Sequence, residues 1–134
     1  MSRLALRQAD PARYDNVRAE DLWRQGRFAE AELILSKALQ AEPRLSLTHV
    51  NMGLCLFKEG SWVRAESHLR RSIRLGTRDP DAFSALGAIL AGQGKFPEAA
   101  SAWNQALVLN PSDPQLRRNL DRLKSLSDGK VPPP

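Results

Sequence analysis

Apolar residues recur along this chain at the spacing of a helix rather than in the alternation typical of strands. The clearest stretch is the segment 114–127, where Leu116, Leu120 and Leu123 stand at positions i, i+4 and i+7 with charged residues between them. A helix with this pattern presents one apolar face and one polar face. Together with the turn residues described below, the pattern predicts seven helices, at residues 12–25, 28–41, 46–59, 62–75, 80–93, 96–109 and 114–127.

One short phrase, glycine–x–aromatic–x–x–alanine, occurs three times along the sequence. It reads GRFAEAE at 26–32, GSWVRAE at 60–66 and GKFPEAA at 94–100, so its glycines are 34 residues apart. Glycine permits a turn with positive φ, and the aromatic residue gives the following helix a large apolar anchor. The alanine allows a neighbouring helix to come close. The phrase therefore predicts tandem helix pairs over residues 12–45, 46–79 and 80–113.

Other positions follow the same period of 34 residues. They are the eighth (Ala19, Gly53, Gly87), the twenty-fourth (Leu35, Leu69, Trp103), the twenty-seventh (Ala38, Ser72, Ala106) and the thirty-second (Pro43, Thr77, Pro111). This set of residues resembles the tetratricopeptide repeat family, and the likeness covers about three quarters of the chain. Thr77 departs from the family pattern, since it replaces the proline that ends the second helix. We expect Gly76 to end that helix instead.

The resemblance implies an all-α fold, a right-handed superhelical array of antiparallel helix pairs. Such a solenoid would consist of an N-terminal extension (1–11), three repeats, a capping helix (114–127) and a flexible tail (128–134). The helix starts agree with it, because Asp79-Pro80 and Asp113-Pro114 each read as an N-cap followed by proline at the first helical position. Asp10-Pro11 lies one residue out of phase, so the first helix of repeat one is expected to begin slightly early.

Composition places the chain among ordinary soluble proteins of one domain. It has 134 residues, one cysteine and a formal net charge of +5. One cysteine excludes an intrachain disulfide, and no apolar run is long enough for a signal peptide or a membrane span. We therefore expect a cytoplasmic protein. The basic segments 46–79 and 114–134 are separated by the acidic segment 80–113, which disfavours nucleic acid or a membrane as the partner.

Apparent catalytic motifs do not fit their chemistry. The fragment GQGK at 92–95 has Ile89 and Phe96 where a phosphate-binding loop needs glycine and serine or threonine. His49 and His68 have no cysteine or carboxylate at metal-ligand spacing, and Cys55 stands between two leucines as a small packed residue. We predict a protein with no catalytic residue, no metal and no cofactor.

The resemblance implies that the first helix of each repeat lines a concave face that binds peptides. The predicted groove residues are Arg13, Asn16, Glu20, Trp23, Leu47, Val50, Asn51, Leu54, Phe57, Ser84 and Ala88. The segment 46–59 is apolar nearly all round, so it is either fully buried or has a partner on its second face. We favour a groove for an apolar or amphipathic segment of a partner protein, in an adaptor or small chaperone. The alternative is that the N-terminal segment or a second copy of the chain covers these residues.

A subgroup of the family clamps the C-terminal carboxylate of heat-shock chaperones with two lysines, two asparagines and an arginine. Only Asn51 matches that set here, and Glu20 and Asp81 would repel a carboxylate. We therefore expect no such clamp. Small bacterial chaperones of the family, which cradle apolar secretion subunits, are more similar in size and surface.

Two other functions stay open. A charge-driven surface could form on helix 62–75, which carries Arg64, His68 and Arg71 on one stripe, together with the basic capping helix. It could meet nucleic acid, an anionic membrane or an acidic protein. A self-assembling scaffold is the other possibility, with a homo-oligomer formed through Trp23 or residues 1–11.

Overall fold

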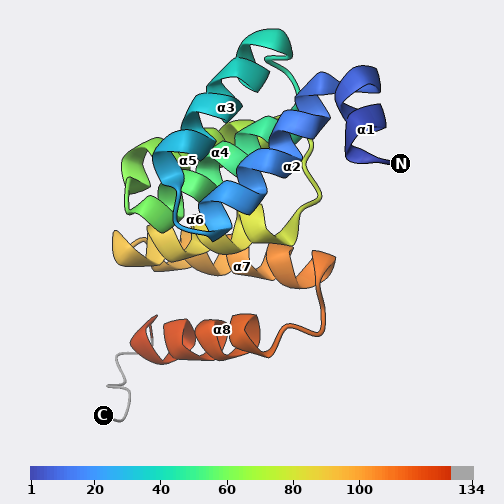
Figure 1. Cartoon of the computed structure of the whole chain (residues 1–134). Coiled ribbons are helices and arrows are strands. Elements are labelled where there is room, and N and C mark those ends of the chain that lie inside the picture. The colour runs from blue at the N-terminus through green and yellow to red at the C-terminus, as the bar shows by residue number, and fades with distance from the viewer. Residues whose placement is uncertain (128–134) are drawn as a thin grey trace. The chain divides into compact units, whose positions relative to one another are not determined.

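The computed structural model describes residues 1–127, which form eight α-helices (Figure 1). They are α1 (Arg3–Ala9), α2 (Pro11–Arg24), α3 (Phe28–Ala41), α4 (Ser46–Glu59), α5 (Trp62–Arg74), α6 (Pro80–Gly92), α7 (Phe96–Leu109) and α8 (Pro114–Ser127). The all-α prediction is confirmed, and α2 to α8 lie within one residue of their predicted bounds. The predicted number of seven was wrong, because the N-terminal extension holds a further helix. The predicted tail, 128–134, lies outside the described residues.

The additional helix, α1, is short and its sequence gives little helical pattern. Ser2 begins it, since the Oγ atom of Ser2 accepts a hydrogen bond from the Ala5 backbone N–H at 3.1 Å. The helix packs against α2, and the guanidinium of Arg3 reaches the Asp21 carboxylate at 3.0 Å. The extension is therefore attached to the first helix of repeat one.

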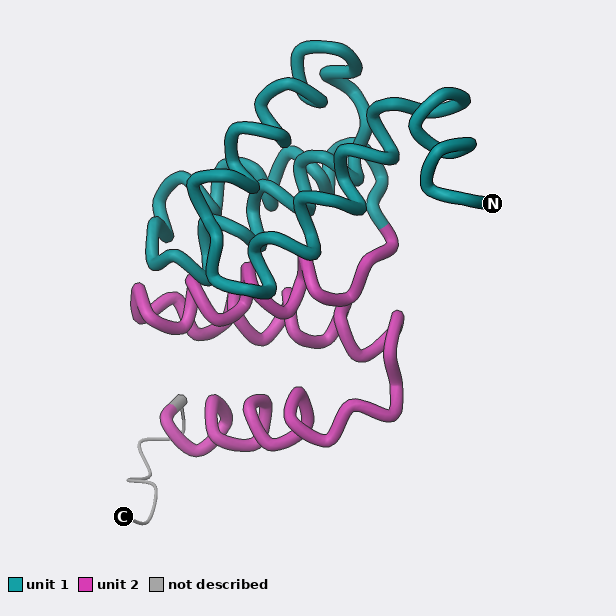
Figure 2. Tube along the Cα trace, viewed as in Figure 1, with its two compact units in different colours: residues 1–77 teal, residues 78–134 magenta. Residues whose placement is uncertain are grey.

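The chain divides into two compact units, which Figure 2 shows in different colours. Unit 1 comprises residues 1–77 and unit 2 begins at Arg78. In unit 1, α2 packs with α3 and α4 with α5, while α4 also touches α2 and α3. In unit 2, α6 packs with α7, and α7 with α8. The pairs α2–α3, α4–α5 and α6–α7 are the helix pairs that the three repeats predict.

Local residues set where the helices begin and end. The side chains of Asp10, Asp79 and Asp113 accept hydrogen bonds from the first turns of α2, α6 and α8, each followed by proline at the first helical position. Gly76 ends α5 as expected: its φ is 89°, and the N–H of Thr77 reaches back to the Ser72 carbonyl at 3.0 Å. This bond closes the helix end without the proline that repeats one and three use.

The two helices of a repeat come close where one of them has almost no side chain. A β-carbon placed on Gly53 would lie 2.6 Å from Cδ2 of Leu69, and one on Gly87 would overlap the Trp103 indole. Ala19, at the same place in repeat one, is fully buried. The Trp103 ring is also fixed by a hydrogen bond, since its Nε1 donates to the Ser84 carbonyl at 3.0 Å. The small eighth residue of each repeat is therefore a packing requirement.

We predict that Gly87→Ala destabilises the protein. The added methyl must displace the Trp103 ring and strain its bond to Ser84, and overpacking of this kind costs about 1–3 kcal/mol. The measurement is the free energy of unfolding in urea. Gly92→Ala is the matched control, because a methyl there meets no atom within 4 Å, and better helix propensity makes it neutral or slightly stabilising. Equal stability of the two variants would contradict the packing argument.

Candidate functional site

The structure places the predicted groove residues of unit 1 in environments that range from exposed to buried. Arg13 is exposed, whereas Glu20, Leu47 and Phe57 are half-buried. The remaining five are buried: Asn16, Trp23, Val50, Asn51 and Leu54. In unit 2, Ser84 and Ala88 are half-buried. The expectation that all of these positions lie open is corrected for the five buried residues.

The burial of α4 has a direct physical cause. This helix packs against α2, α3 and α5 at once, so a single apolar stripe cannot serve all of its neighbours. Its nearly continuous apolar sequence is the consequence of this position. Val50 and Leu54, 1% and 8% exposed, are therefore core residues, and the half-buried Leu47 and Phe57 are the more accessible of the apolar side chains predicted on this helix.

A buried polar network joins α2 to α4. The side-chain amide nitrogen of Asn16 donates to the Thr48 hydroxyl and to the Ala12 carbonyl, each at 2.9 Å. The amide nitrogen of Asn51 donates to the Asn16 side-chain oxygen at 2.9 Å. The two asparagines, both predicted to contact a partner, are instead bonded to each other inside unit 1. They hold together the first helices of repeats one and two.

We predict that Asn16→Ala destabilises the protein by about 2–3 kcal/mol, because the Thr48 hydroxyl and the Asn51 amide lose a buried partner. Urea unfolding would measure the loss, with Asn104→Ala as a control at an exposed asparagine. The double variant Asn16→Ala/Asn51→Ala is expected to lose less than the sum of the two single variants, since both remove the same bond. Simple additivity would argue against the network.

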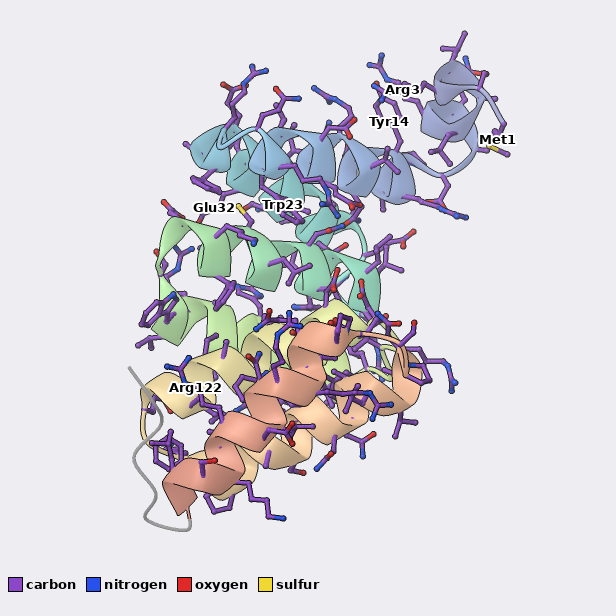
Figure 3. The ribbon with its side chains drawn as sticks, turned by 90° about the horizontal axis from the view of Figure 1, so that it is seen from below. Met1, Arg3, Tyr14, Trp23, Glu32 and Arg122 are labelled. Atoms are coloured by element: carbon purple, nitrogen blue, oxygen red, sulfur yellow. The ribbon has the colours of Figure 1, made fainter. Side chains whose placement is uncertain are left out.

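Trp23 lies at the C-terminal end of α2, between α2 and α4 in the view of Figure 3. Its side chain is 6% exposed, and its Nε1 is the one buried side-chain nitrogen or oxygen in residues 1–127 without a hydrogen-bond partner. An unpaired buried donor of this kind costs about 1–3 kcal/mol. Trp103 differs, because its indole N–H is bonded to Ser84.

A pocket of about 350 Å³ opens beside this tryptophan. Its lining residues are Trp23, Arg24, Gly26, Phe28 and Lys58, which come from α2, the turn after it, α3 and α4. The Arg24 guanidinium lies over the Trp23 ring, 4.8 Å from its centroid, and donates two hydrogen bonds to one Glu20 oxygen. The pocket is therefore aromatic on two sides and basic at its rim.

The two histidines, far apart in sequence, lie in contact between α4 and α5. Their Nδ1 atoms are 3.3 Å apart and their rings are stacked. His49 Nε2 is 3.0 Å from the Pro43 carbonyl, which can only accept, so Nε2 carries the proton and Nδ1 of His49 accepts from His68. Burial, the neighbouring His49 ring and Arg64 together lower the pKa of His68, while Glu32 opposes them. The antiparallel pairing of α4 with α5 makes this contact, which the spacing in sequence conceals.

We predict that the stability of the protein falls as the pH drops below about 6.5, the usual pKa of histidine. His68 has a lowered pKa in the folded state, so the unfolded chain takes up this proton first and protonation favours unfolding. The loss continues to the lower folded pKa and then levels off. Urea unfolding at several pH values between 5 and 7.5 would show it. His68→Gln should flatten this part of the profile, and an unchanged slope in that variant would count against the assignment.

The surroundings of Cys55 do not activate its thiol. Burial, with nearby Glu32 and Glu59, raises the pKa of the Cys55 thiol to about 11, so the sulfur stays protonated at neutral pH. No group of three metal-ligating side chains occurs within the described chain. Every helix between residues 1 and 127 is too short or too polar to cross a bilayer.

Part of the positive charge on α5 is paired with carboxylates: Arg64 of the predicted stripe, and Arg70 beside it. Arg64 forms an ion pair with Glu32 of α3, and Arg70 pairs with Glu66 at 2.9 Å. On α8 of unit 2, the Arg117 guanidinium donates to the Pro111 carbonyl and that of Arg118 to Gln115. These interactions tie several of the arginines to their own unit.

Comparison with family models gives two matches, both described as tetratricopeptide repeat, at residues 22–89 and 80–113. The chain belongs to the tetratricopeptide repeat family. The match at 22–89 runs from the last residues of α2 through α3, α4 and α5 into α6, and the match at 80–113 corresponds to the third predicted repeat.

Curated relatives confirm the repeats but are much longer proteins. Human tetratricopeptide repeat protein 16 is 28% identical over 100 residues, which are 69% of this chain and 12% of that protein. Superkiller protein 3 of Schizosaccharomyces pombe is 27% identical over 75 residues, 56% of this chain and 5% of that protein. The chain thus spans a small part of the curated relatives that it matches.

Among solved structures, the first tetratricopeptide domain of Spaghetti (RPAP3), bound to the HSP90 peptide SRMEEVD, has a TM-score of 0.79 and 21% identity. The match covers 87% of this chain and 93% of that one. The second domain of human RPAP3, in complex with the HSP70 peptide SGPTIEEVD, has a TM-score of 0.71 and 22% identity over 82% and 92% of the two chains. At this identity the likeness shows a shared tetratricopeptide fold.

Proposed function

We propose that this chain is a non-catalytic protein-binding module, an adaptor or small chaperone. It holds an apolar or amphipathic segment of a partner protein against α2 and α4, the first helices of repeats one and two. The observation that carries the proposal is the pocket at the α2–α4 side of unit 1, with two aromatic walls and a basic rim. Pockets that bind peptide side chains combine apolar walls with a few polar groups in this way.

Two further facts support binding on this side. Both RPAP3 domains of the same fold are described in complex with peptides, so the fold is suited to extended ligands. In this chain Phe57 of α4 is half-buried, and Val17 of α2 is 37% exposed, which leaves apolar surface on two of the helices expected to line the groove. The driving force would be burial of apolar area, with charge selecting among partners.

We do not extend the RPAP3 peptides to this chain. The clamp that the family uses for chaperone carboxylates matches here only at Asn51, and this amide is buried and bonded to Asn16. Glu20 stands at another clamp position and is paired with Arg24. Both features support a partner other than a clamped C-terminal carboxylate.

The alternative of a basic surface on α5 is weaker, because Arg64 and Arg70 are paired with carboxylates. Self-association through Trp23 is also weaker, since a side chain that is 6% exposed offers a second copy of the chain no broad apolar face and only the small pocket that it lines. The exposed apolar residues of unit 1 include Leu33 and Val63, and they lie on second helices rather than on the proposed binding side.

We predict that Phe57→Glu weakens binding of peptides selected from a displayed random library by at least about tenfold, since it places a charge where apolar area is buried. Val17→Glu is expected to act in the same direction. Leu54→Glu is unsuitable as a test, because Leu54 is 8% exposed and a buried charge would unfold the chain. Fluorescence anisotropy gives the affinities, and circular dichroism checks the helices.

Val63→Glu serves as the control for added charge, because Val63 is 83% exposed at the start of α5. It should bind the selected peptides as the natural sequence does. If Phe57→Glu and Val63→Glu bind equally well, the α2–α4 side is not the binding surface.

A further inference from the structure

The two buried tryptophans of this protein differ in one respect. Trp103 satisfies its indole N–H with the Ser84 carbonyl at 3.0 Å. Trp23 has an equally buried ring, yet no atom of residues 1–127 accepts a hydrogen bond from its Nε1. Buried polar groups in native proteins nearly always have partners, so a single exception requires an explanation. Because Trp23 also lines a pocket, a ligand in that pocket can supply the missing acceptor.

The two basic side chains of the pocket, Arg24 and Lys58, differ in whether they have a partner. Arg24 is occupied, since it is bonded to Glu20 and stacked over the Trp23 ring. Lys58 is exposed, and within residues 1–127 its ammonium has no hydrogen bond or ion pair with any side chain. The pocket is therefore lined by a tryptophan whose indole N–H is unpaired but covered in this structure, and by a lysine whose charge is unpaired. Both groups select an acceptor, and the cation selects a negative one.

We propose that the Trp23 pocket is a subsite for a carboxylate side chain, glutamate or aspartate, on an otherwise apolar partner segment. The carboxylate accepts from the Trp23 indole and faces the Lys58 ammonium, while the methylene groups of the ligand lie against the rings of Trp23 and Phe28. A carboxylate only accepts hydrogen bonds when ionised, which suits two donors. This assignment rests on the proposed function, and it adds the chemistry that one position of the partner must have.

Access to the indole N–H involves Arg24. Nε1 has almost no exposed surface of its own, so the proposal requires side chains beside the pocket to shift, and Arg24, which lies over the ring face, is the charged one among them. The Arg24–Glu20 pair spans one helical turn and both side chains are about half exposed. Exposed pairs of this kind are weak, so a ligand carboxylate can compete with Glu20 for Arg24. Glu20 compensates the charge of Arg24 while the site is empty, and the charge of Lys58 remains uncompensated.

The test follows the indole signals of ¹⁵N-labelled protein by NMR. The chain has three tryptophans, and Trp23→Phe assigns the signal of interest. The probe is N-acetyl-leucyl-glutamate amide, whose only charge is the side-chain carboxylate. We expect a saturable downfield shift of the Trp23 indole proton, with the Trp103 signal unmoved because its N–H is already bonded. The glutamine analogue of the probe should bind at least about threefold more weakly.

A matched pair of variants isolates the charge. Lys58→Gln should weaken binding of the glutamate probe by about threefold or more and should leave binding of the glutamine probe unchanged. Lys95→Gln removes the same charge from an exposed lysine of unit 2 and should leave both probes unaffected. Helicity and urea unfolding check that each variant folds.

Three results would overturn the assignment. One is an unmoved Trp23 signal up to about 20 mM probe, a concentration that detects even millimolar affinity. The others are equal binding of the two probes, or equal binding by Lys58→Gln and the natural sequence. In each case the library-selected peptides can still bind and respond to Phe57→Glu, so the wider proposed function is judged separately. If the probe binds while Phe57→Glu leaves peptide binding unchanged, the subsite is supported and the wider binding surface is not.

Discussion

The structure depends on how closely the two helices of a repeat approach each other. At Gly53 and Gly87 the backbone of one helix touches a large side chain of the next, Leu69 or Trp103. This contact sets the spacing of each pair and so determines which side chains remain on the outer side of the first helix. The repeated glycine–x–aromatic phrase turns the chain so that the contact can form. A larger residue at the eighth position would push the two helices apart along the whole pair.

Helix positions were predictable from the sequence because their causes are local. Aspartate followed by proline starts α2, α6 and α8, and a glycine with positive φ ends α5. These residues act on the backbone within one turn, so no knowledge of the neighbours is needed. The helix α1 was not predicted, because the signal that reveals the other helices is absent from it. It has seven residues and no buried side chain, so it lacks the apolar periodicity by which the other helices are recognised.

The candidate site was predictable only in part, because burial is a property of helix pairs. The family pattern directs attention to α2 and α4, but it cannot tell that α4 packs against three helices at once. Asn16 and Asn51 look like surface amides until the contact between α2 and α4 is known. The stacked histidines depend in the same way on how α4 meets α5. No spacing in the sequence can reveal the unpaired indole N–H of Trp23, because its pairing depends on which atoms lie around it in the folded protein.

The network of Asn16, Thr48 and Asn51 gives repeat one a role that the other repeats cannot fill. Asn16 is the fifth residue of repeat one, and the fifth residues of repeats two and three are Val50 and Ser84, so neither can form the same bonds. Sliding α2 along α4 by one turn would leave the amides and the hydroxyl buried and unpaired, which fixes the axial register of the two helices. Repeat one is therefore not an interchangeable module. A copy of repeat two or repeat three in the place of repeat one would leave Thr48 and Asn51 without their present partner.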